Sequence, residues 1–275
     1  SPLGWYGEAL AYLNIGDIPF AIKGLLDAIE RDPGDFEMIS AVGDLWLDLG
    51  DVEQAESWLH RANTVGSGQA FPLRSQLSLY KYREQHEQAR ELVKQVLERD
   101  LEDRHGTSFN FRQTWAFESG LKGDYQAGLM AYRDTFDWAF QASLEAPGNV
   151  HFQLWDIVQI AALLKLAEPL SDRPEELLDI VAANADRLHP RWGVWGPNLL
   201  RASIATIRGQ NTDALQLLEN VFDQKWRFGW RDTLLFDLIF SQLSNEPRYQ
   251  DLIVRYEQDM TRQRELAYEL LEIQN

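Results

Sequence analysis

Residues of the same kind return along the first hundred positions of the chain at a fixed step of 34 residues. The series are aromatic (Tyr12, Trp46, Tyr80), small (Ala21, Ala55, Ala89), aliphatic (Leu25, Leu59, Val93) and again small or aliphatic (Ala28, Ala62, Val96). Small side chains let neighbouring helices approach closely, and the larger apolar ones fill the space between them. The pattern therefore predicts an all-helical repeat of 34 residues.

A turn signal divides each period. Gly16-Asp17 and Gly50-Asp51 join a glycine, which tolerates left-handed backbone angles and ends one helix, to an aspartate, which caps the next helix. In the third period Glu84 stands where the turn glycine is expected. The elements predicted from these signals are helices over about 3–15 and 18–31, a second unit over 35–68 and a third unit over 70–103.

The later units keep the pattern less strictly. A fourth unit follows a longer connection over 101–108, turns at Gly123-Asp124 and has a second helix expected to run to Leu144. The last helix carries many charges, which is typical of the solvent-facing cap of a repeat array. The remaining expected elements are helices over 150–166 and 171–188, a Pro- and Gly-rich loop over 189–197, a helix pair over 197–221, and a final pair over 233–243 and 247–272.

The 34-residue step at four positions, together with Gly43 and Gly123-Asp124-Tyr125, resembles the tetratricopeptide repeat. The resemblance implies an all-α fold, a right-handed superhelical solenoid of about seven antiparallel helix pairs. It also implies binding of a peptide or helix of another protein in a concave groove. We expect residues 1–275 to form a single solenoid, with regular repeats over about 2–103, irregular repeats over 104–231 and a capping pair over 232–275.

The stretch 234–260 resembles the closing unit of bacterial arrays that follow a winged-helix regulator domain or a nucleotide-cyclase domain. This resemblance implies that the chain is the C-terminal part of a larger bacterial protein, and a start without Met fits that expectation. Many such proteins have a membrane span before the array. The compartment stays open between the cytoplasmic and the periplasmic side of a membrane-anchored protein.

The composition of the chain disfavours several classes of function. With 26 basic and 43 acidic residues the formal net charge is −17, which disfavours direct binding to nucleic acid. The chain has no cysteine, no apolar run long enough for a membrane span, and no pair among its five histidines at metal-ligand spacing. We therefore expect no cofactor and no catalysis, and we interpret the chain as a protein- or peptide-binding scaffold or sensing module.

Two regions supply candidate partner-binding residues. The region 189–231 has six basic against three acidic residues, interleaved with aromatic rings, in an otherwise acidic chain. Arginine beside aromatic rings suits recognition of a carboxylate-bearing peptide, although the same residues could pack a joint between units. The first helices of the middle repeat units supply Arg74, Lys81, Gln113 and Phe117. The basic aromatic region supplies Arg191, Trp192, Trp195, Arg227 and Trp230.

Three alternatives remain open. The chain could sense a small ligand between the irregular fifth unit and the Trp-rich loop. It could be an all-α glycosidase with two acids among Asp44, Glu118 and Asp156. It could also self-associate through the first helix, where Leu3, Tyr6 and Leu10 have no preceding unit to cover them. The Lys-Asn-Arg clamp of chaperone-binding repeats is absent apart from Arg74, so that ligand is not expected.

Overall fold

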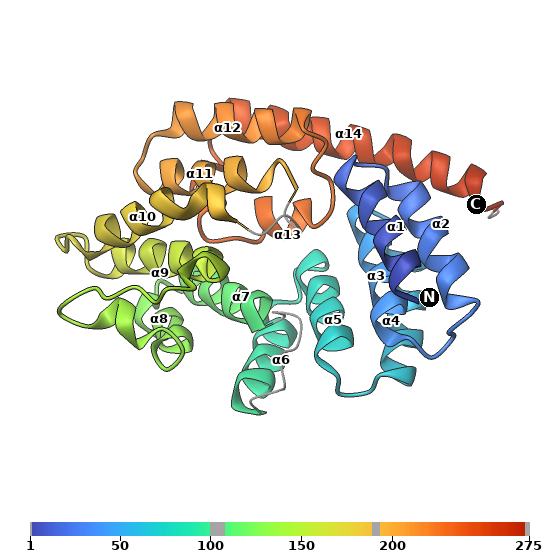
Figure 1. Ribbon diagram of the computed structural model, residues 1–275, viewed down its shortest axis with the longest axis horizontal. Helices are drawn as coiled ribbons and strands as arrows, with labels where there is room; N and C mark the ends of the chain where they lie inside the picture. The colour runs from blue at the N-terminus through green and yellow to red at the C-terminus, as the bar shows by residue number, and fades with distance from the viewer. Residues whose placement is uncertain (1, 100–107, 189–192, 273–275) are drawn as a thin grey trace. The chain divides into compact units, whose positions relative to one another are not determined.

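The computed structural model describes residues 2–99, 108–188 and 193–272, and within them the regular structure is entirely helical (Figure 1). The longer helices are α1 (Pro2–Asn14), α2 (Ile18–Ile29), α3 (Phe36–Asp48), α4 (Val52–Val65), α5 (Ala70–Tyr82), α6 (His86–Arg99), α7 (Ser108–Leu121), α8 (Tyr125–Arg133), α9 (Leu154–Ala167), α10 (Arg173–Asn184), α11 (Gly196–Ile207), α12 (Asn211–Asp223) and α14 (Pro247–Leu270). The short ones are α13 (Trp230–Leu234) and the 3-10 turns η1 (Asp137–Phe140), η2 (Val150–Phe152), η3 (Ala185–Arg187) and η5 (Phe240–Leu243).

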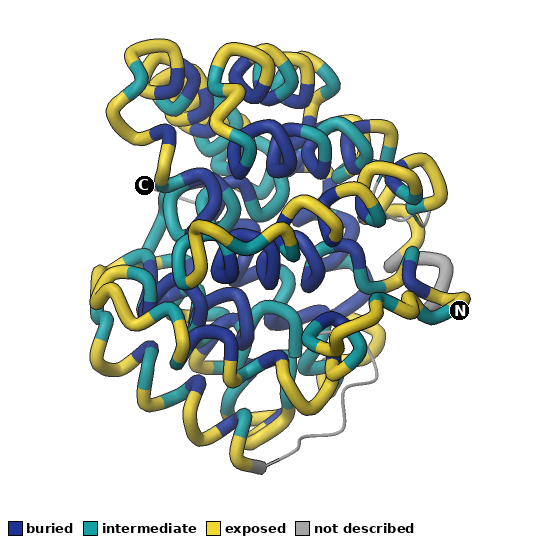
Figure 2. The backbone as a smooth tube through the Cα atoms, turned by 90° about the vertical axis from the view of Figure 1, so that its left-hand side faces the viewer, coloured by how far each residue is buried: buried dark blue, intermediate teal, exposed yellow. Residues whose placement is uncertain are grey.

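Consecutive helices pack in pairs, from α1 with α2 to α11 with α12, so the predicted all-α repeat is confirmed. The repeated small and aliphatic positions lie in the interior: Ala21, Ala55 and Ala89 have no exposed surface. Figure 2 shows the buried residues along the packed sides of the helices and the exposed ones at turns and outer sides. The sequence period is thus the period of the core.

The turns have the predicted chemistry. Gly16 and Gly50 adopt φ angles of 75° and 79°, and the carboxylate of Asp51 accepts a hydrogen bond from Gln54 N at 3.0 Å. Glu84, which replaces the turn glycine of the third period, takes the same left-handed conformation with φ of 54°. The turn geometry therefore persists where the glycine is missing, with backbone strain at Glu84.

Two predicted helices are wrong. α8 ends at Arg133 rather than near residue 144, and the chain continues as η1, where the Asp137 carboxylate accepts from the neighbouring Trp138 N at 2.7 Å. The segment 233–243 contains only the end of α13 and the 3-10 turn η5. There the Asp237 carboxylate accepts from Ile239 N at 2.7 Å. Aspartates that bond to their own backbone compete with helix formation.

The chain divides into two compact units. The first contains α1 to α6, the 225–233 segment and α14 from Gln250 onward; the second contains α7 to α12 and the 234–249 segment. Each unit is therefore discontinuous in sequence. The single solenoid expected for residues 1–275 stays a prediction.

Candidate functional site

In the first unit, α3 and α5 present a shared polar surface, the α3–α5 face, which consists of Asp44, Asp48, Arg74, Ser78 and Lys81. Residues three or four positions apart lie on one side of a helix, and α3 packs against α5. Asp44, Asp48 and Lys81 are only 8%, 5% and 3% exposed. Charged side chains are rarely buried to this extent without partners, so the face needs a polar covering.

The 225–233 segment supplies this covering. Gly229 N donates to the Asp48 carboxylate at 2.8 Å, and the Trp230 indole N–H donates to the Asp48 carbonyl at 3.1 Å. The Asp232 carboxylate pairs with Lys81 Nζ at 2.9 Å and accepts from Ser78 Oγ at 2.7 Å. Every one of these contacts joins parts of the chain at least 150 residues apart in sequence.

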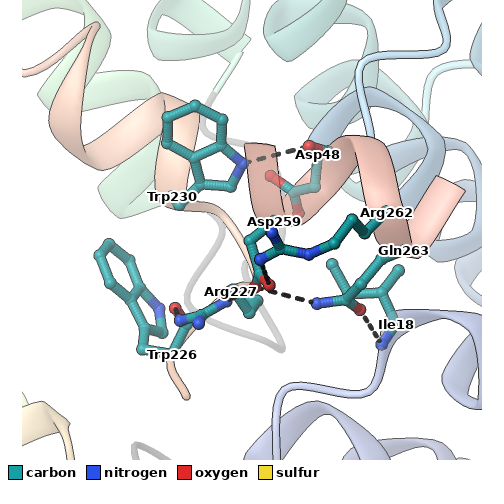
Figure 3. A network of polar contacts seen from close by, with 8 residues as sticks. All are labelled: Ile18, Asp48, Trp226, Arg227, Trp230, Asp259, Arg262 and Gln263. Atoms are coloured by element: carbon teal, nitrogen blue, oxygen red, sulfur yellow. Dashed lines mark hydrogen bonds and ion pairs between the residues drawn. The ribbon is translucent and has the colours of Figure 1, made fainter. Parts of the chain in front are cut away.

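Arg227 anchors the other end of the segment against α14 (Figure 3). Its Nε lies 2.5 Å from the Asp259 carboxylate, its Nη1 donates to Trp226 O at 2.9 Å, and the residue is 1% exposed. Burial raises the pKa of Asp259, but hydrogen bonds from Arg227 and Arg262 outweigh that effect and hold this pKa below its usual value. The carboxylate therefore stays charged and paired.

The aromatic rings of the segment pack against one residue of α14. The Trp230 ring stacks on Tyr256 with centroids 5.0 Å apart and planes at 7°, while Trp226 meets the same ring edge-on at 6.1 Å. Trp226, Trp230 and Tyr256 are 2%, 0% and 0% exposed. Trp226 and Trp230, two rings of the basic aromatic region, thus lie in the interior of the first unit.

Burial strongly raises the pKa of one carboxylate on the α3–α5 face, that of Asp48. Loss of solvent, with the nearby charges of Asp232 and Asp44, raises the pKa of Asp48 well above its ordinary value, although the hydrogen bond from Gly229 and the charge of Arg231 oppose the change. Burial likewise raises the pKa of Asp44 despite its ion pair with Arg74. Folding of this unit therefore favours protonated aspartate.

We expect Asp48→Asn to weaken the pH dependence of stability. An unfolded aspartate has a pKa of about 3.9. Because the folded pKa is higher, the contribution of Asp48 is fully present below the unfolded pKa and is lost as the pH rises through the folded one. The variant keeps an acceptor for Gly229 N and should lose less stability between pH 4 and 8, measured as urea midpoints.

The exposed Asp32, changed to Asn, is the matched control and should leave the pH dependence as it is in the unsubstituted chain. Parallel pH profiles for the Asp48→Asn variant and the unsubstituted chain would contradict the assignment to Asp48.

The second unit has a comparable polar interior, the α7–α9 face, formed by Arg112, Gln113, Asp156 and Gln159. Gln113 Nε2 donates to Asp237 Oδ2 at 2.5 Å, and Gln159 Nε2 donates to the same oxygen. Arg112 Nε pairs with Asp156 at 2.8 Å. Asp237 belongs to the 234–249 segment, and burial raises its pKa although the two glutamines act in the opposite direction.

The predicted partner-binding residues divide between these two interiors. Arg74, Lys81, Arg227 and Trp230 lie in the first unit, where Arg74 pairs with Asp44. Gln113, Phe117 and Trp195 lie in the second, where the Phe117 ring meets Phe236 edge-on at 6.3 Å and Trp195 is 7% exposed. Arg191 and Trp192 lie outside the described residues.

Sequence reasoning did not single out the aspartates that hold these residues: Asp48, Asp232, Asp237 and Asp259. One signal was available, because Asp44 and Asp48 share a face of the otherwise apolar α3. For the others nothing in the sequence separates them from the remaining acidic residues.

The carboxylates considered for catalysis have interior environments. Asp44 is paired with Arg74, Asp156 is paired with Arg112, and Glu118 is 2% exposed. Within the described parts of the chain, no group of three or more His, Asp or Glu side chains is placed to hold a metal ion. Among the described helices, none combines the length and the apolar character that crossing a bilayer requires.

Comparison with known proteins gives a likeness to solved structures. No family model and no curated protein matches the sequence. The fold is similar to that of a solved tetratricopeptide repeat protein from Parabacteroides merdae, with a TM-score of 0.44 and 16% sequence identity over 98% of this chain and 97% of that one.

The internal geometry defines the architecture more closely. The described helices stack as antiparallel pairs, the first three turns each contain a left-handed residue, and aspartates cap α2, α4 and α8. Together with the 34-residue step, these features make the chain an all-α helical-repeat protein whose period and turns resemble those of the tetratricopeptide repeat.

Proposed function

We propose that this chain is a non-catalytic scaffold or sensing module. It would bind a peptide or a segment of another protein along the first helix of each repeat, such as α3 and α5. The observation that supports the proposal most directly is the 225–233 segment itself. The α3–α5 face holds a short stretch of chain through the Lys81–Asp232 ion pair, a main-chain hydrogen bond from Gly229 to Asp48 and the buried indole of Trp230. These are the contacts by which helical-repeat surfaces hold peptides.

Arg74 and Phe71 are the part of this region that an external partner reaches first. The Arg74 side chain is 16% exposed and lies over the Phe71 ring at 4.7 Å. An arginine stacked on an aromatic ring offers a partner both a charge-assisted hydrogen bond and apolar area. We expect partner carboxylates to bind at this edge.

A displayed random-peptide library selected on the immobilised chain tests the proposal. Peptides that bind should bind Arg74→Gln about tenfold more weakly, because the substitution removes a charged contact worth about 1.4 kcal/mol. Arg83 follows the C-terminal end of α5 and is exposed beside Glu56, so Arg83→Gln should change affinity by less than about twofold. The proposal fails if no peptide is enriched over an unrelated repeat protein, or if both variants bind like the unsubstituted chain.

The setting of the module is part of the proposal. The resemblance of residues 234–260 to bacterial closing units favours a place at the C-terminal end of a larger bacterial protein. The module would then lie on the cytoplasmic or the periplasmic side of a membrane-anchored protein.

A second function, sensing of a small polar ligand, is favoured by one observation in the second unit. The Tyr132 hydroxyl and Gln159 Oε1 are buried there without a hydrogen-bond partner, and the charges of Asp156, Arg112 and Asp237 act on Tyr132. Unsatisfied buried polar atoms mark places where water or a ligand is held. In a thermal-shift screen, a small molecule that raises the melting temperature, and fails to do so with Tyr132→Phe, would favour this function.

A further inference from the structure

The contacts of the 225–233 segment are arranged as in a bound peptide. Ion pairs hold its two ends, Arg227 to Asp259 and Asp232 to Lys81, while Gly229 N–H bonds to Asp48 between them. The segment has no helix from residue 226 to residue 229, and α13 is only five residues long. A short irregular segment fixed by its main chain, two charges and a buried indole has the chemistry of a ligand.

One polar atom near this segment is left over. Arg74, which pairs with Asp44, has its Nε buried on α5 without a hydrogen-bond partner. Asp44 is close enough to Asp232 and Lys81 for their charges to act on it. A buried donor or acceptor that loses its partner costs about tenfold or more in an equilibrium constant. The 225–233 segment therefore leaves part of the hydrogen-bonding capacity beside the α3–α5 face unused.

We infer that the 225–233 segment is a built-in ligand of the α3–α5 face and of the adjoining part of α14, and that the external ligand is a peptide of the same chemistry. Such a peptide carries an arginine, an aromatic residue three positions later and an acidic residue two positions after that, as Arg227, Trp230 and Asp232 do. It also brings a further hydrogen-bonding group for Arg74 Nε. This inference rests on the proposed function and names the partner class for the same face.

Because the 225–233 segment is covalently connected to the face that it covers, it competes with any external peptide for that face. A segment tethered by a short connection competes at an effective concentration on the order of millimolar. An external peptide that makes the same contacts is therefore outcompeted below roughly millimolar concentration. A peptide that also satisfies Arg74 Nε gains about tenfold. The built-in segment acts as an autoinhibitory competitor, which rejects weak ligands.

The test uses a labelled synthetic peptide with the sequence of residues 225–233 and measures its binding by fluorescence anisotropy. The full chain carrying Asp232→Ala, in which the tethered competitor lacks one ion pair, is expected to bind the peptide at least about tenfold more tightly than the unsubstituted chain. A peptide with alanine at the positions of Arg227 and Asp232 is the matched control and is expected to bind neither chain.

The same peptide gives a second readout that needs no substitution. Gly229 N–H is protected by its bond to Asp48. The peptide, supplied above the roughly millimolar effective concentration of the tethered segment, should therefore speed hydrogen exchange at Gly229 in the unsubstituted chain. The inference is overturned if a folded Asp232→Ala chain binds the peptide no better than the unsubstituted chain does. Should that variant fail to fold, unchanged exchange at Gly229 overturns it.

Library peptides that bind while the 225–233 peptide does not would leave the proposed function standing and remove only this inference. Failure of both kinds of peptide to bind would remove both.

Discussion

Replacing Arg227 by alanine is expected to lower the free energy of unfolding by about 3–5 kcal/mol, the usual cost of breaking a buried ion pair. The arginine is 1% exposed and pairs with Asp259 at 2.5 Å, and its guanidinium lies 5.3 Å from the centre of the Tyr256 ring. The substitution removes this packing and leaves Asp259 without its buried partner. Equilibrium urea unfolding followed by circular dichroism and by tryptophan fluorescence measures the loss.

Arg262→Ala is the matched control for Arg227. Arg262 pairs with the same Asp259 carboxylate at 2.8 Å, but its side chain is 65% exposed. Exposed ion pairs contribute little because water screens them, so the expected loss is under about 1 kcal/mol. Equal losses for the two variants would show that the burial of Arg227 contributes nothing.

Replacing Trp230 by alanine is expected to cost about 3–5 kcal/mol of unfolding free energy, as for other large-to-small changes in a core. The side chain has no exposed surface, stacks on Tyr256 and donates its indole N–H to the Asp48 carbonyl. Trp230→Phe keeps a ring on Tyr256 but loses the donor, and is expected to cost about 1–3 kcal/mol. Urea unfolding at one pH compares the two variants.

Trp58→Ala on α4 is the control for loss of an indole. Trp58 is half-buried, with Arg61 lying 5.4 Å from its ring, so the expected loss is about 1 kcal/mol. A loss for Trp230→Ala no larger than that for Trp58→Ala would contradict the place of Trp230 in the core.

The helix pairs could be predicted because their contacts are local. Ala21, Ala55 and Ala89 pack within their own and neighbouring helices, so the sequence period reports the core directly. Even the irregular third turn kept its geometry, since Glu84 adopts the conformation that the pattern assigns to glycine.

Residues 225–243 contact helices that lie far earlier in the sequence, and these contacts could not be predicted in the same way. Gly229 bonds to Asp48 across 181 positions, and Gln113 bonds to Asp237 across 124. No period of the sequence connects such residues. The sequence offered two interpretations of the basic aromatic region, a binding surface and a packing joint, which differ in side-chain exposure. Arg227 and Trp230 are buried in the structure, while the binding role of the region stays a prediction.

The discontinuity of the first unit affects the order in which the protein is made and folded. Helices α1 to α6 are synthesised first, but Ile18 N donates to Gln263 Oε1 and Asp51 accepts from the Tyr268 hydroxyl, across 245 and 217 positions. Domains generally fold as their residues leave the ribosome, and an uncovered face is open to aggregation until it is complete. The first unit is therefore completed only after α14 has been made.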